Sequence, residues 1–252
     1  MSGRVALVTG AGRGIGRATA LLLTERGERV MAIARSEHEL RALADEASVE
    51  WHACSVASEE GCAEAVAETR RRLGPVQILV NNAGIGSFHE RAIHEQDPAV
   101  WHESLAINLH APFHLMRLCV PDMIEAGWGR IVTVSSTAGE VGAPQNSAYC
   151  AAKHGVIGLM RAVAQDVAPH GITCNAVLPG WVRTRMANED AEAEAASGGR
   201  SVDEIWAERA ASYAAGRVLE PSEIAAVIAF LASDAASGVN GEAVKVALGS
   251  VW

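Results

Sequence analysis

The stretch from Val5 to Gly16 reads VALVTGAGRGIG, a short apolar run followed directly by a glycine-rich turn. A bounded apolar run of this kind predicts a buried β-strand, and the helical periodicity from Ile15 to Arg26 predicts a helix after the turn. Glycines between a strand and a helix let the backbone approach a pyrophosphate, which the free N–H groups and the positive dipole end of the helix can bind. The sequence therefore predicts a dinucleotide site, although ordinary turns also collect glycine.

The rest of the chain repeats this alternation of short apolar runs and longer helical stretches. Because parallel strands need long crossovers, the alternation predicts a Rossmann-like α/β fold, a doubly wound parallel sheet with helices on both faces. Further strands are expected at Val30–Ile33, Val76–Val80, Ile131–Val134 and Ile172–Val177. Further helices are expected at Glu37–Glu46, Glu59–Leu73, Pro98–Glu125, Ala148–Val167 and Ser222–Leu231.

Composition indicates the size and the compartment of the protein. The 252 residues are 49% hydrophobic, which suits the core of one undivided α/β domain. The five cysteines are scattered without a C-x-x-C pair, so they indicate neither a disulfide framework nor a thiolate zinc site. No apolar run approaches the roughly 20 residues that span a bilayer, and the N-terminal run is too short for a signal peptide. We expect a soluble protein of the reducing cytoplasm.

The formal net charge of −9 argues against a nucleic-acid or acidic-membrane partner and favours a small-molecule substrate. Histidine spacing gives no convincing metal site. His110 and His114 are four residues apart in an expected helix, but no carboxylate or thiolate partner is evident, so a packed or solvated pair is favoured over zinc. We expect no catalytic metal.

The end of the second expected strand, Ala34-Arg35-Ser36, has no carboxylate. In dinucleotide-binding folds an acidic side chain here binds the ribose 2′-hydroxyl of NAD, whereas a basic one binds the 2′-phosphate of NADP. Arg35 and Ser36 could bind that phosphate, with Arg13 approaching from the glycine turn. We therefore expect NADP(H) rather than NAD(H). The alternative is that both arginines are solvated and Ser36 caps the next helix.

Tyr149 and Lys153 are four residues apart in an expected helix and therefore share one of its faces. A free tyrosine has a pKa near ~10 and is a poor base at neutral pH. The ammonium group and the positive ring of an oxidised nicotinamide favour the phenolate, so we expect them to lower the pKa of Tyr149. Y-x-x-x-K also occurs by chance, and its meaning depends on the rest of the chain.

Motifs in the same order over almost the whole chain resemble those of the short-chain dehydrogenases/reductases. The matches are the T-G-x-x-x-G-x-G turn at Thr9 to Gly16, the N-N-A-G motif at Asn81 to Gly84, the helix asparagine at Asn108, the catalytic serine at Ser136, the Y-x-x-x-K pair, and the P-G-x-x-x-T segment at Pro179 to Thr184. Each residue alone also has a plain structural interpretation, such as a strand-end hydroxyl for Ser136 or a helix hydrogen bond for Asn108.

The resemblance implies an oxidoreductase with Asn108, Ser136, Tyr149 and Lys153 as catalytic residues. Tyr149 would protonate the carbonyl oxygen in reduction, or deprotonate the alcohol in oxidation, as hydride passes to or from the nicotinamide. Ser136 would hydrogen-bond the same oxygen. Lys153 would bond the nicotinamide ribose and lower the tyrosine pKa, and Asn108 would hold a water that links Lys153 to solvent.

The resemblance also implies the cofactor contacts. Thr184 and the backbone near Val182 would fix the carboxamide, and Asn82 to Gly84 would line the adenosine ribose. The full expected set is Gly10, Arg13, Gly14, Ile15, Gly16, Arg35, Ser36, Ser55, Val56, Asn82, Ala83, Gly84, Tyr149, Lys153, Pro179, Gly180, Val182 and Thr184.

The chain departs from the family pattern at two points. Ser55 stands where the family commonly has an Asp that bonds adenine, so adenine recognition would be weaker or made by the backbone. Near the C-terminus the usual V-D-G-G reads Val246-Ala247-Leu248-Gly249. We expect a homo-oligomer, a tetramer or a dimer, but this change puts the family's usual tetramer interface in doubt.

The expected substrate pocket is mainly apolar, which favours a ketone or a 3-oxoacyl substrate. Its expected lining is Ala138, Val141, Gln145, Trp181 and Met186, with Trp206 as a further candidate. The chain also resembles the 3-hydroxybutyrate dehydrogenase branch of the family. That branch positions a carboxylate with Gln, His and Lys where this chain has Gly86, Ala138 and Asn146, so a small hydroxy acid is a poor candidate.

Between Arg185 and Ala215 the composition shifts to Ala, Glu and Gly, and a mobile substrate lid is expected at about 185–215. A surface helical hairpin without a role in the reaction is the alternative.

The favoured function is an NADP-dependent carbonyl or 3-oxoacyl reductase. The alternative enzyme is an NAD-dependent secondary alcohol dehydrogenase working in the oxidative direction. A dinucleotide-sensing or scaffold protein would have lost part of the catalytic tetrad, which is complete here. Sugar-nucleotide epimerases share the glycine turn and Y-x-x-x-K but usually need a larger C-terminal domain.

Overall fold

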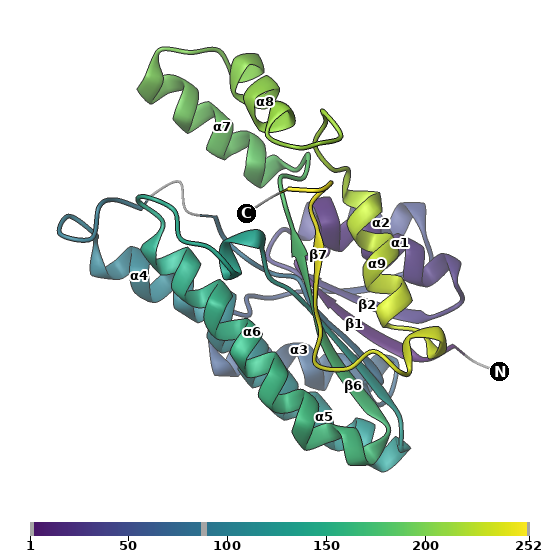
Figure 1. Cartoon of the computed structure of the whole chain (residues 1–252). Helices are drawn as coiled ribbons and strands as arrows, with labels where there is room; N and C mark the ends of the chain where they lie inside the picture. The colour runs from purple at the N-terminus through teal and green to yellow at the C-terminus, as the bar shows by residue number, and fades with distance from the viewer. Residues whose placement is uncertain (1–2, 87–89, 251–252) are drawn as a thin grey trace.

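The computed structural model describes residues 3–86 and 90–250 (Figure 1). Over these residues seven parallel strands form one sheet in the order β3-β2-β1-β4-β5-β6-β7. The order reverses between β1 and β4, and at such a switch point a doubly wound sheet leaves a crevice beyond the carboxyl ends of its strands. The strands are β1 (Val5–Thr9), β2 (Arg29–Ala34), β3 (Glu50–Ala53), β4 (Ile78–Asn81), β5 (Gly129–Val134), β6 (Ile172–Pro179) and β7 (Ala243–Val246).

Helices cover both faces of the sheet, and each face has its own core. Along β1, Ala6 and Val8 pack into one core with α1, α2 and α9, whereas Leu7 packs into the other with α3, α5 and α6. This two-sided burial explains why the central strands are apolar throughout. The helices are α1 (Gly14–Glu25), α2 (Glu37–Glu46), α3 (Glu59–Arg72), α4 (Pro98–Leu105), α5 (Ala111–Ala126), α6 (Ser147–Val167), α7 (Arg185–Gly198), α8 (Val202–Ala211) and α9 (Pro221–Leu231).

The predicted doubly wound parallel sheet is confirmed, and each predicted strand and helix lies within a few residues of an observed one. The periodicity missed the two edge strands, β3 and β7. Both have four residues, and most of their side chains are only partly buried. An edge strand of this kind lacks the continuous apolar run that identifies a buried strand.

The stretch predicted as one helix from Pro98 to Glu125 is interrupted. A π-helical turn, η1 (Ala106–His110), joins α4 to α5. Such a turn inserts a residue into the helix without ending it, so the hydrophobic periodicity barely registers it. Asn108 lies within η1 and is almost fully buried.

The segment from Arg185 to Ala215 forms a helical hairpin, α7 and α8, that extends beyond the sheet (Figure 1). Gly199 ends α7 in the left-handed conformation, and a capping box between Ser201 and Glu204 begins α8. The two helices bury a small core of their own around Trp206 and Tyr213.

Among the described residues no helix is long and apolar enough to cross a bilayer.

Candidate active site

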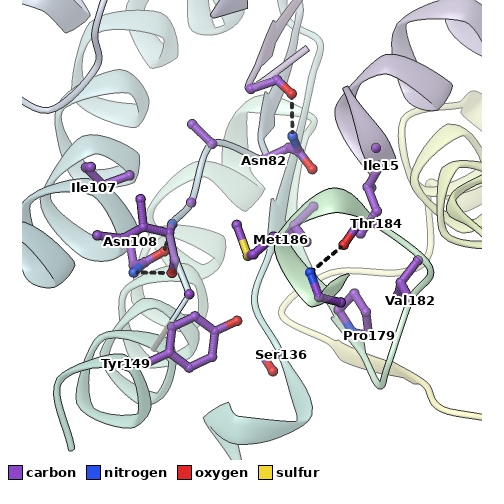
Figure 2. Close-up of a pocket in the computed structure, with 18 of the residues that line it drawn as sticks. Ile15, Asn82, Ile107, Asn108, Ser136, Tyr149, Pro179, Val182, Thr184 and Met186 are labelled. Carbon is purple, nitrogen blue, oxygen red and sulfur yellow. Dashed lines mark hydrogen bonds between the residues drawn. The ribbon is translucent and has the colours of Figure 1, made fainter. Parts of the chain in front are cut away.

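A groove with a volume of about 410 Å³ lies beyond the carboxyl ends of the central strands. Its lining includes every expected catalytic and cofactor-binding residue except Gly16. Segments that are far apart in sequence therefore meet in one site, and part of it is drawn in Figure 2.

The glycine turn forms one wall of the groove. Gly10 and Gly14 have φ angles of +64° and +56°, which a residue with a side chain rarely adopts. Gly16 lies beneath the turn, where an added Cβ would be 2.3 Å from the Gly10 oxygen. Helix α1 begins directly after Arg13 without a side-chain cap, so its first N–H groups are available to an anion. This cradle fits the pyrophosphate of a dinucleotide.

Hydrogen bonds tie the turn to the end of β4. The Thr9 hydroxyl accepts from the backbone N–H groups of Asn82 and Ala83, at 3.1 and 3.0 Å. The Asn82 amide donates back to the Thr9 and Gly10 carbonyls, at 2.9 and 3.2 Å (Figure 2). The N-N-A-G segment therefore fixes the floor of the groove.

At the end of β2, Arg35 and Ser36 line the groove, and Ser55 and Val56 line it after β3. Among the described residues no carboxylate pairs with Arg35. Glu39, which the sequence analysis missed, also lines this region, and its carboxylate lies 3.6 Å from Arg13 and 3.8 Å from Arg185. The sequence did contain a hint of this carboxylate, because Glu39 lies only four residues after Arg35, in the first turn of the next helix.

The residues that we expect to transfer protons gather farther along the groove. The Tyr149 hydroxyl, from α6, and the Ser136 hydroxyl, from the second residue after β5, lie near one another in the groove (Figure 2). The Lys153 ammonium lies 5.4 Å from the centre of the Tyr149 ring and donates to the Val134 carbonyl at 3.0 Å. The phenol, the hydroxyl and the ammonium therefore form one cluster.

The pKa of Tyr149 differs from our expectation. Burial raises the pKa of Tyr149 to about 12, and only the hydrogen bond with Ser136 opposes that change. Burial also lowers the pKa of Lys153 to about 8. The reason for the difference is that burial removes both groups from water and so disfavours the charged form of each. Our expectation of a lowered tyrosine pKa also included the positive ring of an oxidised nicotinamide, which would favour the phenolate.

Asn108 holds the segment after β4. Its side chain exchanges two hydrogen bonds with the backbone of Ile85, each 3.2 Å, and donates to Ser104. Gly84 lies between Asn108 and Lys153, since an added Cβ would be 2.9 Å from Asn108 Oδ1 and 3.7 Å from Lys153 Nζ. The water relay that we expected at Asn108 stays a prediction.

Beyond Tyr149 the groove is lined mainly by apolar side chains, including Ala138, Val141, Trp181 and Met186 as expected. Two other expected lining residues are elsewhere. Gln145 is exposed, and Trp206 is buried in the core of the helical hairpin. A polar residue that we did not anticipate, Asp190 of α7, lines the groove and is ion-paired with Arg209 at 2.6 Å.

The histidines, cysteines and carboxylates of the described residues form no group of three that could hold a metal ion. The glycine cradle at the switch point and the phenol, hydroxyl and ammonium beside it define a dinucleotide-dependent oxidoreductase.

Comparison with known proteins identifies the family. The model of the short chain dehydrogenase family matches residues 4–195. D-beta-hydroxybutyrate dehydrogenase of Cupriavidus necator is 35% identical over 96% of this chain and 95% of that protein. Acetoacetyl-CoA reductase of Rhizobium meliloti is 37% identical over 96% of each. The 3-oxoacyl-acyl-carrier-protein reductase of Escherichia coli is 36% identical over 97% of this chain and 96% of that protein.

Solved structures agree. A single-residue variant of an actinorhodin polyketide ketoreductase with NADPH superposes with a TM-score of 0.93 at 36% identity, covering 98% of this chain and 96% of that one. Levodione reductase superposes with a TM-score of 0.88 at 34% identity, covering 96% and 95%. The chain belongs to the short-chain dehydrogenases, as the motifs predicted, and is an oxidoreductase of that family.

Gly16→Ala should damage the cradle, because its Cβ would collide with the Gly10 carbonyl and the Asn82 amide. We expect a loss of about 1–3 kcal/mol in the free energy of unfolding and at least a roughly tenfold loss of dinucleotide affinity. Urea unfolding and fluorescence titration measure these. Gly158→Ala is the control, since Gly158 is an exposed residue of α6 with open space around it; it should gain about 0.5–1 kcal/mol. Equal affinities in the two variants would contradict the assignment.

Proposed function

We propose that this chain is an NADP(H)-dependent reductase of a ketone or a 3-oxoacyl substrate, with Asn108, Ser136, Tyr149 and Lys153 as its catalytic residues. The observation that carries the proposal is the pair of hydroxyls on Tyr149 and Ser136, which lie near one another in the groove that contains the glycine cradle (Figure 2). Similarity to acetoacetyl-CoA reductase and to a polyketide ketoreductase with NADPH supports both the reaction and the cofactor.

The groove offers contacts along the whole length of a dinucleotide. The glycine turn and the start of α1 bind the pyrophosphate, and Arg35 with Ser36 binds the 2′-phosphate. Thr184 and the backbone near Val182 hold the carboxamide, and Lys153 donates to the ribose beside it. When bound, the nicotinamide supplies or accepts the hydride.

Tyr149 exchanges the proton with the substrate oxygen. Because burial raises the pKa of Tyr149, the phenol is protonated at neutral pH and can donate to a carbonyl oxygen. Ser136 hydrogen-bonds the same oxygen and stabilises the negative charge that develops on it. Lys153, joined by a water held at Asn108, returns a proton to the tyrosine.

The lining beyond Tyr149 supports an uncharged carbonyl substrate. At the three positions where the related branch binds a carboxylate this chain has Gly86, Ala138 and Asn146, which line the groove and carry no positive charge. The charged side chain that lines the groove from the middle of α7 is an acid, Asp190, which is ion-paired with Arg209. A free hydroxy acid is therefore disfavoured, despite the 35% identity to a D-beta-hydroxybutyrate dehydrogenase.

The second candidate is an NAD-dependent secondary alcohol dehydrogenase that works in the oxidative direction. The observation that favours it is Glu39, whose carboxylate lies in the groove opposite Arg13 and partly neutralises the charge available to a 2′-phosphate. The two candidates differ in whether Arg35 gives the protein a preference for NADPH over NADH.

We also place the protein in the cytoplasm as a homo-oligomer, a tetramer or a dimer. The five cysteines, which are free thiols, support a reducing compartment. Phe113 of α5 and Phe230 of α9 are 46% and 43% exposed, and apolar side chains of this size favour contact with a second copy.

Arg35→Ala should remove the preference for NADPH. Loss of a charge-assisted contact to the 2′-phosphate should raise the Kd for NADPH at least about tenfold and leave the Kd for NADH within roughly twofold. Fluorescence titration with both cofactors measures this, and Arg41→Ala, an exposed arginine farther along α2, is the control. A wild-type protein that binds both cofactors equally would favour the NAD-dependent alternative.

Tyr149→Phe should abolish turnover and leave NADPH binding nearly intact, because only the transferable proton is lost. The assay is NADPH oxidation with a panel of ketones and 3-oxoacyl thioesters, and NAD reduction with secondary alcohols. Tyr213→Phe is the control, because it removes a phenol that bonds the Trp181 backbone instead of lining the groove. Turnover in the Tyr149 variant would exclude that residue from the mechanism.

We propose that α7 and α8 act as a lid over the substrate. Trp206→Ala should loosen the small core that holds them together, and we expect the KM of the carbonyl substrate to rise roughly tenfold while the Kd of NADPH stays unchanged. Steady-state kinetics and titration measure the two constants. Trp128→Ala, which removes an indole stacked on Arg4 and Arg130 instead, is the control. Equal effects on both constants would contradict the lid.

A further inference from the structure

Glu90 is a buried carboxylate that the mechanism above does not use. It lies between β4 and α4, and only 3% of its surface is exposed. A buried carboxylate is costly unless hydrogen bonds compensate it. Here Oε2 accepts from the backbone N–H of Ala148 and Oε1 from that of Tyr149, both at 2.8 Å.

Those two N–H groups belong to the first turn of α6, the helix that carries the catalytic phenol. The N-cap residue of α6, Asn146, makes no side-chain capping bond. The first-turn N–H groups of a helix have no partner within it, so they need an outside acceptor when buried. Glu90 is that acceptor, and it reaches α6 from a segment 58 residues earlier in the chain.

We propose that Glu90 is a positioning residue for proton transfer, because its carboxylate clamps the first turn of α6 and so holds the Tyr149 hydroxyl toward Ser136. The inference rests on the proposed function only for the step that Tyr149 performs. The clamp grips the backbone N–H of Tyr149 itself, so a loosened first turn moves the phenol directly.

The charge of Glu90 acts in the same place. The groups around the phenol are Ser136, Lys153 and Cys150, together with the carboxylates Asp190 and Glu90. Burial is the main cause of the raised pKa of Tyr149, and both carboxylates raise that pKa further. Loss of the Glu90 charge should therefore lower the pKa of the phenol. An ordinary helix cap would affect stability alone.

The test uses the chain's two tyrosines, Tyr149 and Tyr213, which give two resonances after labelling with ¹³C at Cζ. Tyr213→Phe assigns them. In Glu90→Gln we expect the Tyr149 resonance to move at pH 7, and kcat for carbonyl reduction to fall roughly tenfold with the Kd of NADPH within about twofold. The rate of alcohol oxidation rises with pH as the phenol loses its proton, and this rise, the pH limb, should move to lower pH by roughly half to one unit.

Glu90→Asp is the conservative variant, since it keeps the charge and shortens the reach; its pH limb should stay near that of the wild type, with kcat partly restored. It also serves if Glu90→Gln does not fold. Asp97→Ala is the matched control, because Asp97 is an exposed carboxylate that caps α4 through the N–H of Ala99 at 2.8 Å. This control should leave the Tyr149 resonance and the pH limb unmoved.

A Glu90→Gln protein with lower stability but an unmoved Tyr149 resonance and pH limb would overturn the proposal and reduce Glu90 to a helix cap. The positioning role is also excluded if kcat falls no further than in Asp97→Ala. If the wild-type protein reduces no carbonyl with NADPH while the Tyr149 resonance still responds to Glu90→Gln, the proposed function fails and the clamp stands.

Discussion

The site depends on the bonds between Thr9 and the two residues that follow β4, Asn82 and Ala83. At a switch point the crossovers from β1 and β4 leave toward opposite faces of the sheet, so the two chains diverge beyond their last paired residues, Val8 and Val80. A single buried hydroxyl accepts both N–H groups, and the Asn82 amide returns a bond to the turn. These bonds fix the backbone of the glycine turn from below, so its groove side is left accessible to a ligand.

At the other end of the groove, burial controls the chemistry. The same desolvation that raises the pKa of Tyr149 lowers that of Lys153, so the cluster is closer to neutral than the spacing of the two residues suggests. A protonated phenol suits donation to a carbonyl oxygen. A nicotinamide ring is positively charged only in the oxidised cofactor, and that charge would favour the phenolate form of Tyr149. The protonation of the phenol would then depend both on its burial in the protein and on the oxidation state of a bound cofactor.

Sequence could predict the parts of this site that lie on one regular element. The glycine turn, Y-x-x-x-K and the central strands carry their signal in spacing or in continuous apolar runs. The π-turn at Asn108 and the edge strand β3 carry almost none, because one inserted residue or four half-exposed ones barely change a periodic pattern. Gln145 and Trp206 were assigned to the pocket from neighbourhood in the chain, whereas packing turned one to solvent and the other into the hairpin core.

The sequence did not predict the three carboxylates near the site, Glu39, Glu90 and Asp190. All three come from segments with no catalytic motif: Glu39 lines the groove beside Arg13, Glu90 bonds the backbone of Tyr149, and Asp190 lines the groove near the phenol. A negative charge near a tyrosine or an arginine has no characteristic spacing, since only the tertiary fold brings the two together. The motifs define which reaction the family performs. Contacts such as those of these acids have no sequence signature, so they must be sought in the structure.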